Sequence, residues 1–212
     1  MWKKSGEICR MRDIYFISDS MLRRIASGDR DAFRSFYDII YPLVYRFIHY
    51  FLPNRADCEE VVSDVFFIFW KERYSLIDKK DLKAWIYIVC RNEAYHYLKQ
   101  KERNMNISID DMPVELLIEK NNIEGEMIEE EMLNVYNNAV SELPERCKLI
   151  FLMIREERLK HKEVAQILSI AEGTVEQQMN IAIRKIVETV RKYYPFLSFN
   201  DKKSKKQKFL YR

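Results

Sequence analysis

The sequence predicts an all-α protein of two small helical domains joined by a flexible acidic linker. Apolar residues recur at helical spacing through most of the 212 residues, and no segment shows sustained period-2 alternation. The chain has only four glycines and five prolines, and several of them stand where helical patterns stop. Because 48 % of the residues are hydrophobic, each half of the chain can bury a core.

Charge divides the chain into four blocks. Residues 1–103 carry a net charge of +4, residues 104–141 carry −8, residues 142–194 carry +2 and residues 195–212 carry +5. Such asymmetry suggests that the basic ends contact nucleic acid and that the acidic middle serves another purpose. Helical periodicity fades from Asn104 to about Gly125, which predicts the flexible linker. The basic tail looks disordered.

Several functional classes lack support in the sequence. No apolar run reaches 18 residues, and residues 1–17, an N-terminal extension, have charges throughout and no secretory h-region. The four cysteines form no CxxC pair and the three histidines are scattered, which favours reduced thiols in a cytoplasmic protein without a metal site. No P-loop, GxGxxG, HExxH or catalytic triad is recognisable. We therefore expect no enzymatic activity, no cofactor and no small-molecule substrate.

The first half reads as four helices. Ser18 and Asp19 can cap the first, and Asp31 begins the second, in which Pro42 either kinks the helix or restarts it. The third runs from about residue 56 to residue 73. Its less regular face combines carboxylates with Phe67 and Trp70, and this is typical either of a partner surface or of a broad buried stripe.

The fourth helix is predicted to have an apolar face and a basic face. A polar loop, residues 74–81, precedes it, and Asp81 can cap it. The apolar stripe comprises Leu82, Trp85, Ile86 and Val89. The opposite side offers Lys83, Tyr87, Arg91, Asn92, Tyr95, His96, Lys99, Lys101 and Arg103. Cations bind phosphates, and rings and amides contact unpaired bases, although an ordinary solvated face has the same composition.

The second half begins with a helix over residues 126–143, whose apolar residues Leu133, Tyr136, Val140 and Leu143 are in register. Pro144 takes the first position of the next helix, which ends near Glu157. A third helix follows, then the break Ser169-Ile170-Ala171 and a fourth helix. This last pair has the spacing of a helix-turn-helix, but a tight αα-hairpin has it too.

The last helix has a polar forward face. Gln177 and Asn180 are able to pair with adenine, while positive charge comes only from the flanking residues. Ala171 stands at the capping position, where a polar side chain would satisfy the first turn.

The span from about Ser18 to Tyr194 resembles a bacterial RNA polymerase sigma factor of the sigma-70 family, extracytoplasmic-function group. The motifs that carry the resemblance are GDRDAFRSFYDIIYPLVYRF, ADCEEVVSDVFFIFWKERYSLIDKKDLKAWIYIVCRNEAYHYL and SELPERCKLIFLMIREERLKHKEVAQILSIAEGTVEQQMNIAIRKI. The resemblance implies a sigma-2 domain over residues 18–103 and a sigma-4 domain over residues 126–194, on either side of the linker 104–125. The implied partners are core RNA polymerase, promoter DNA and an anti-sigma factor, typically bound to the membrane.

The resemblance also implies three sets of contact residues. Promoter −35 contacts would come from Lys160, His161, Lys162, Thr174, Glu176, Gln177, Gln178, Asn180, Ile181 and Arg184. Contacts with the −10 element would come from Tyr74, Ser75, Lys79, Lys80, Lys83, Arg91, Asn92, Tyr95 and His96. Core polymerase would be bound by Asp57, Glu60, Ser63, Asp64 and Phe67.

Two other functions compete with this one. A helix-turn-helix regulator with a helical sensor domain would bind DNA without polymerase, and a helical adaptor would not bind DNA at all. The first half has no signature of a ligand pocket, which favours the sigma-factor hypothesis.

Overall fold

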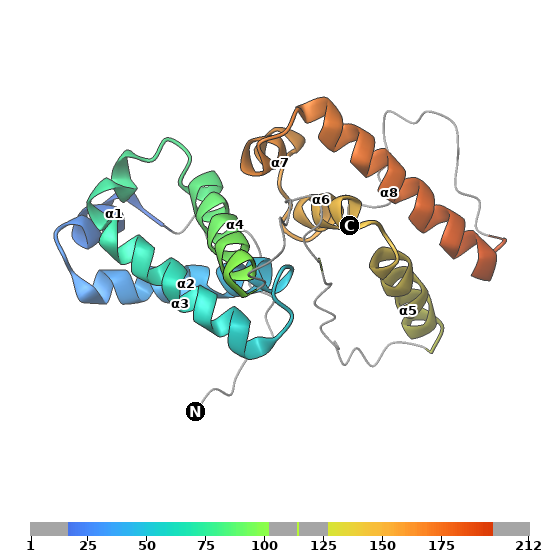
Figure 1. Ribbon diagram of the computed structural model, residues 1–212, viewed down its shortest axis with the longest axis horizontal. Helices are drawn as coiled ribbons and strands as arrows, with labels where there is room; N and C mark the ends of the chain where they lie inside the picture. Colours follow the sequence, from blue (N-terminus) through green and yellow to red (C-terminus); the bar gives the residue numbers. More distant parts are fainter. Residues whose placement is uncertain (1–16, 102–113, 115–126, 197–212) are drawn as a thin grey trace.

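The computed structural model describes residues 17–101, 114 and 127–196, and these parts contain helices but no strand, so the all-α prediction is confirmed. One group of helices comprises α1 (Asp19–Ala26), α2 (Arg30–His49), α3 (Arg55–Lys71), the 3₁₀ helix η2 (Arg73–Asp78) and α4 (Leu82–Lys101). The other comprises α5 (Met127–Ser141), α6 (Glu145–Arg155), α7 (His161–Leu168) and α8 (Glu172–Tyr193) (Figure 1).

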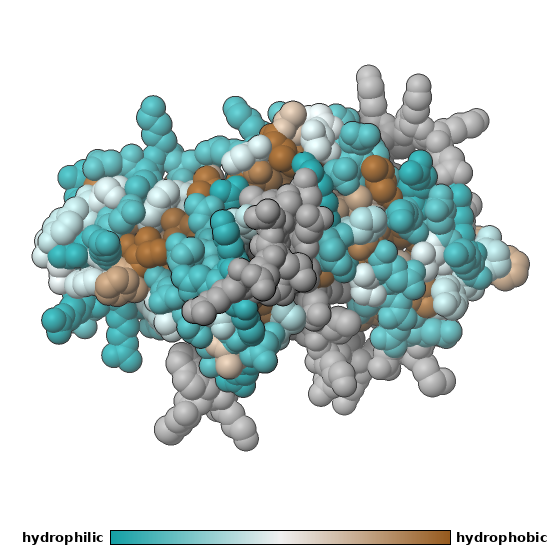
Figure 2. Space-filling view, in the orientation of Figure 1, coloured by the Kyte–Doolittle hydropathy of each residue, from teal (hydrophilic) through white to brown (hydrophobic). Residues whose placement is uncertain are grey.

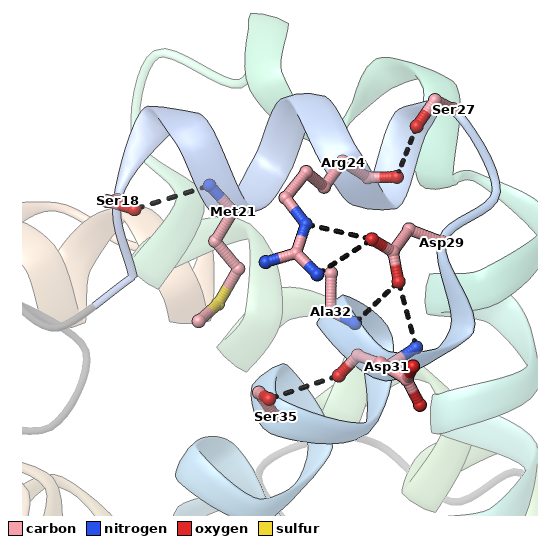
Figure 3. Close-up of polar contacts among 8 residues, drawn as sticks. All are labelled: Ser18, Met21, Arg24, Ser27, Asp29, Asp31, Ala32 and Ser35. Carbon is pink, nitrogen blue, oxygen red and sulfur yellow. Dashed lines mark hydrogen bonds and ion pairs between the residues drawn. The ribbon is translucent and has the colours of Figure 1, made fainter.

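Asp29 organises the turn between α1 and α2 (Figure 3). Its carboxylate accepts hydrogen bonds from the backbone N–H groups of Asp31 (2.9 Å) and Ala32 (3.0 Å) and pairs with Arg24 (2.8 Å). Gly28 has a φ of 87°, which favours glycine and lets the chain reverse between the helices. Since Asp29 is the cap, α2 begins one residue earlier than predicted.

Two features of the first helices agree with the sequence pattern. The Ser18 hydroxyl accepts a hydrogen bond from the Met21 N–H at 3.2 Å, so Ser18 caps α1 as predicted. Pro42 lies inside α2, which continues to His49 without a second start.

The core of the first group is rich in aromatic rings. Phe36 and Phe69 pack edge to face at 6.1 Å, and Phe47 lies 4.8 Å from Tyr87. Leu76 of η2 is fully buried. Residues 74–81 were expected to form a polar loop, and that prediction is wrong for residues 74–78, because burial of Leu76 folds them into a 3₁₀ helix that packs on α1.

The buried face of α4 differs from the predicted stripe. Its buried residues are Ala84, Ile86, Tyr87, Cys90, Ala94 and Leu98. Tyr87 was expected on the basic face but is fully buried, because its hydroxyl finds a partner in the second group of helices. Trp85 is half-buried against Phe69, at 5.2 Å. Asp81 caps the helix as predicted, accepting from the Ala84 N–H at 2.9 Å.

The second group is centred on α6, whose residues from Cys147 to Met153 are all buried. Two predictions are corrected. Pro144 is the residue before the helix rather than its first position, and Leu133 is 47 % exposed although its spacing placed it in the core.

The break between α7 and α8 has the predicted length. Ser169 adopts the left-handed conformation, with φ of 56°, and ends α7. Ala171 is in an extended conformation before α8 and has no side-chain atom that can accept a hydrogen bond from the first turn. Helix α8 therefore begins without a side-chain cap.

Val114 is the single described residue of the predicted linker, and only 2 % of its surface is exposed. Its N–H donates to the Glu145 carboxylate (2.5 Å), and its carbonyl accepts from the Lys148 ammonium (2.9 Å). This part of the linker is thus held against the start of α6. The rest of the linker, residues 1–16 of the N-terminal extension and the tail from residue 197 lie outside the described residues.

Three of the four cysteines lie in the described parts, and Cys58, Cys90 and Cys147 are buried free thiols, as predicted. Burial raises the pKa of the Cys58 thiol to about 12 and also raises the pKa values of Cys90 and Cys147. No described helix is both long and apolar enough to cross a membrane.

The two groups of helices meet where α4 packs against α7 (Figure 1). Figure 2 shows a mostly hydrophilic face in the same orientation, with small apolar patches separated by polar residues.

Candidate nucleic-acid interface

The forward face of α8 forms an open polar hollow on the surface. It is lined by Gly173, Glu176, Gln177, Asn180, Ile181 and Arg184, the last five of which the sequence placed on this face or beside it. Gln177 and Asn180 are exposed, so their amide groups can meet the donors and acceptors of a base edge. Arg184 is the only cation of this lining, and Glu176 opposes it in sign.

Gln178 lies elsewhere, although the sequence placed it on the same forward face. Its Oε1 atom accepts a hydrogen bond from the Cys147 thiol at 2.7 Å, which ties the side chain to α6. Thr174 is half-buried in the first turn of α8.

The start of α7 supplies the flanking cations of this face. Lys160 and Lys162 are exposed and His161 is half-buried. The Glu163 carboxylate accepts a hydrogen bond from the Lys160 N–H at 2.5 Å, which caps the first turn.

The second surface combines η2 with the beginning of α4. Tyr74 is exposed, and the Arg73 guanidinium lies 4.1 Å from the centre of its ring. Ser75 donates to the Glu72 carbonyl at 3.0 Å, and the Lys79 ammonium lies 3.2 Å from the Glu72 carboxylate. An exposed ring beside cations is able to stack on an unpaired base.

Farther along α4, the predicted residues divide into those exposed to solvent and those bound to the second group of helices. Asn92 and His96 are exposed one helical turn apart, and Lys80 is exposed before the helix. By contrast, the Lys83 ammonium pairs with the Glu163 carboxylate of α7 at 3.1 Å. Arg91 donates to the Ile167 carbonyl of α7, and burial lowers the pKa of its guanidinium.

Tyr95 is half-buried on the same helix. Because Lys83 and Arg91 are bound to α7, the second group of helices occupies the first half of the basic face of α4.

The third surface is the outer face of α3. Glu60, Ser63 and Asp64 are exposed, and Phe67 shows 66 % of its surface to solvent. Phe67 is therefore exposed rather than part of a broad buried stripe, and the partner surface stays a prediction. Trp70 is half-buried, 5.0 Å from Phe33.

Asp57 is the least accessible residue of that face. Its carboxylate accepts a hydrogen bond from the Tyr97 hydroxyl at 2.7 Å and pairs with Lys101, both from α4. The hydrogen bonds from Lys101 and Tyr97 lower the pKa of Asp57, and the bond to Asp57 raises the pKa of Tyr97 to about 12.

A buried ion pair that the sequence pattern did not reveal joins the two groups of helices. Glu157, between α6 and α7, is fully buried. Its Oε1 atom accepts from Arg46 Nε (2.6 Å) and the Tyr50 hydroxyl (2.9 Å), and its Oε2 atom accepts from an Arg46 terminal nitrogen (2.7 Å) and the Tyr87 hydroxyl (2.8 Å). We call these four residues the Glu157 cluster.

Local signals could not have found the Glu157 cluster, because the partners lie between 70 and 111 positions apart in the sequence. Burial and the charge of Glu157 raise the pKa values of Tyr50 and Tyr87 well above their ordinary value. Burial alone would lower the pKa of Arg46, but hydrogen bonding to Glu157 outweighs it and raises that pKa.

Helical domains with a helix-turn-helix and exposed amide side chains on its second helix are typical of DNA-binding proteins, and comparisons with protein families identify the family. The model of "Sigma-70 region 2" matches residues 36–104, and that of "Sigma-70, region 4" matches residues 133–186. The chain belongs to the sigma-70 family, in its extracytoplasmic-function (ECF) group. It is a sigma factor that acts in transcription initiation, and sigma factors are non-catalytic DNA-binding initiation factors.

Named relatives match over most of the chain. "ECF RNA polymerase sigma factor SigW" of Bacillus subtilis (strain 168) is 20 % identical over 166 residues, which covers 75 % of this chain and 89 % of the relative. The "ECF RNA polymerase sigma-E factor" of Haemophilus influenzae is 23 % identical over 180 residues, covering 80 % of this chain and 92 % of that protein.

Two solved structures share the fold. One is the structure of CnrH in complex with the cytosolic domain of CnrY, with a TM-score of 0.55, 15 % identity and coverage of 82 % of this chain and 97 % of the other. The second is the sigma factor RpoE in complex with the anti-sigma factor NepR from Bartonella quintana, with a TM-score of 0.56, 18 % identity and coverage of 75 % and 96 %.

Proposed function

We propose that this sigma factor directs core RNA polymerase to promoters by reading a −35 element with α8 and a −10 element with α4 and η2, and that it assists promoter melting. The observation that carries the proposal is the open polar face of α8, with Gln177 and Asn180 exposed in the second helix of a helix-turn-helix. In this motif the second helix enters the major groove, where amide side chains pair with adenine.

Recognition of the −35 element depends on polymerase under this proposal. Glu176 lines the reading face, and cations stand mainly at its margins, at Lys160, Lys162 and Arg184. Phosphate contacts supply most of the non-specific affinity of proteins for DNA. A face with so few cations binds duplex DNA weakly until the polymerase presents it to the promoter.

The −10 element is read with its bases unpaired. Extruding a base from the stack costs a few kcal/mol, which capture of that base must offset. Tyr74 is exposed beside Arg73 and offers a ring for stacking, while Asn92 and His96 offer hydrogen bonds at the upstream edge. Asn92→Ala should slow promoter opening, measured by permanganate reactivity of the −10 thymines; unchanged opening would remove Asn92 from the site.

The outer face of α3 binds core polymerase in this scheme. Phe67, with 66 % of its surface exposed, shares one face of α3 with the exposed residues Glu60, Ser63 and Asp64. An exposed aromatic anchor within a polar rim is the usual composition of a binding hot spot. The α3 face thus combines an exposed aromatic side chain with carboxylates that favour a basic partner surface.

The division of labour follows the two groups of helices. Residues 18–103 form the sigma-2 domain and residues 126–194 the sigma-4 domain, with the linker 104–125 between them. Residues 104–125 carry five acidic residues and one basic residue, and this net charge of −4 would let the linker follow basic channel walls in the polymerase. Such a protein works in the cytoplasm, where the polymerase is, and an anti-sigma factor, typically bound to the membrane, would control it.

Run-off transcription tests the proposal directly. Purified core polymerase with the chain should initiate at a cognate promoter, and core polymerase alone should not. A chain that binds DNA without directing initiation would instead be a helix-turn-helix regulator. If it neither binds DNA nor directs initiation at any promoter of its genome, the adaptor hypothesis is favoured.

The role of α8 has a matched control within the helix. Gln177→Ala with Asn180→Ala should abolish dependence on the −35 sequence while core binding stays intact, because both side chains line the open face. Gln178→Ala should leave promoter preference unchanged, since that amide faces Cys147. Loss of core binding in the double variant would contradict the assignment.

A further inference from the structure

The contact between the two groups of helices occupies residues assigned to −10 DNA. Lys83 pairs with Glu163 of α7 at 3.1 Å, and Arg91 donates to the carbonyl of Ile167 in the same helix. Phosphates cannot bind these cations while α7 holds them. The open face of α8, in contrast, remains accessible in this arrangement.

The Glu157 cluster lies at the centre of that contact. Both carboxylate oxygens of Glu157 accept two hydrogen bonds each, and all four donors belong to the first group of helices. Each oxygen therefore has these protein donors only while the two groups are together, and water would replace them on separation. Because a bidentate ion pair and two hydroxyl donors have fixed geometry, they specify one relative orientation of the two groups rather than a non-specific association.

The backbone before α7 presents Glu157 to its partners. Glu157 N–H donates to the Leu152 carbonyl at 3.1 Å, and Leu159 N–H donates to the Met153 carbonyl at 3.1 Å. Between them, Arg158 has a φ of 47°, a left-handed conformation uncommon for a residue with a side chain. The turn thus fixes the position of the Glu157 carboxylate.

We propose that the Glu157 cluster is an autoinhibitory contact that holds α7 over Lys83 and Arg91 and must separate before α4 can bind −10 DNA. This inference rests on the function proposed for α4. The chemistry suits a contact that opens, since charged groups regain hydration when the domains separate and a buried ion pair gains little over that state. Removing Glu157 alone penalises only the closed arrangement, in which Arg46 would stay buried without its carboxylate.

Conformation is measured on the full chain by small-angle X-ray scattering. Glu157→Gln keeps the shape of the side chain but removes its charge, and we expect an increase in the radius of gyration. Glu156→Gln is the matched control, because Glu156 is exposed on the same turn. A compact Glu157→Gln variant of unchanged helicity would overturn the proposal.

Binding is measured with a fluorescent −10 non-template strand and the free protein. We expect at least fivefold tighter binding by Glu157→Gln than by the wild type, with no change in Glu156→Gln. Expansion without tighter binding would show that the contact does not mask the site.

A second variant covers the case in which Glu157→Gln fails to fold. Tyr50→Phe with Tyr87→Phe removes one hydrogen bond from each carboxylate oxygen of Glu157 and keeps both rings. This double variant should also expand and bind the −10 strand more tightly than the wild type. A folded double variant with the radius of gyration and the DNA affinity of the wild type would overturn the proposal.

The proposed function is judged separately by run-off with the wild type. Suppose that the wild type never directs transcription initiation but that its radius of gyration increases when Glu157 is replaced. The role of Glu157 in the interdomain contact would then stand, and the assignment of α4 to −10 DNA would be wrong.

Discussion

Ala171 shows how a single residue can reduce the stability of a functional helix. Its backbone has the extended geometry of an N-cap, with φ of −70° and ψ of 143°, yet its methyl group accepts no hydrogen bond. Ser18, Asp29 and Asn54 accept such bonds at the starts of α1, α2 and α3. The sequence predicted this missing cap correctly because capping is local.

Ala171→Ser should stabilise the chain by about 1 kcal/mol, since a serine hydroxyl can accept from the first turn of α8. The free energy of unfolding, measured by urea titration and circular dichroism, checks this. Ala171→Val is the control, because valine is as poor a cap as alanine. An equal effect of the two substitutions would refute the capping explanation.

Asp29 makes the stability of the chain sensitive to acid. Its backbone hydrogen bond from Ala32 and its contact with Arg24 lower the pKa of the carboxyl from 3.8. A carboxyl with a lowered folded-state pKa stabilises the protein above its unfolded pKa, and this contribution is lost as the pH falls through the folded value. Melting temperature measured from neutral pH to about pH 3 should therefore fall less steeply in Asp29→Asn, because asparagine still caps the helix.

The control for Asp29 is Asp38→Asn, which changes an exposed carboxyl on the same helix. A steeper acid loss in Asp29→Asn than in the wild type would contradict the prediction.

At the scale of individual helices, the sequence pattern predicted where helices form but not which face of α4 is buried. The existence of α1 to α8 follows from apolar periodicity and local caps, which depend only on neighbouring residues. The faces of α4 do not follow, because a second helix pair packs on it and buries Tyr87. Periodicity shows which face of a helix is apolar. Tertiary contacts decide which polar residues are buried as well.

The outer face of α3 provides a test at the scale of an element. Phe67→Ala should leave the melting temperature nearly unchanged, because 66 % of the side chain surface is already exposed. It should weaken core polymerase binding at least tenfold, about 1.4 kcal/mol, as loss of an aromatic anchor does. Affinity for core polymerase and thermal unfolding are both measured.

Tyr193→Ala serves as the control for Phe67→Ala, since Tyr193 is exposed to a similar extent, 64 %, at the end of α8. Similar losses of polymerase affinity in both variants would show that α3 is not the specific contact.

At the scale of the whole molecule, the sequence predicted the two-domain architecture but not the contact between the domains. The Glu157 cluster depends on residues far apart in the chain, and Glu157 has the same local context as its exposed neighbour Glu156. No periodic pattern distinguishes a buried carboxylate from a solvated one. On α8 the sequence predicted the exposure of Gln177 and Asn180 but not the contact of Gln178 with Cys147 of α6, and DNA reading by this face stays a prediction.

Charge is also distributed over the whole molecule, and residues 197–212 carry six basic residues and one acidic residue. Deleting them should weaken non-specific binding to duplex DNA and make it less dependent on salt, because each phosphate that the tail no longer neutralises removes about 0.9 from the slope of log affinity against log salt. Fluorescence anisotropy over a salt series measures the slope. A tail of equal length with its basic residues replaced by glutamine should behave like the deletion; retention of the full slope would contradict an electrostatic role.

The hydrogen bonds to Val114 limit how far the two groups of helices can move apart. With Val114 bound at the start of α6, only the 13 residues after Lys101 connect the domains, a reach of about 45 Å at roughly 3.5 Å per residue. If Lys148 and Glu145 released it, the connection to Met127 would reach about 90 Å. The hold on Val114 therefore halves the distance over which the two groups of helices could separate. Under the proposed function it would also restrict the spacing between the promoter elements that one molecule can contact.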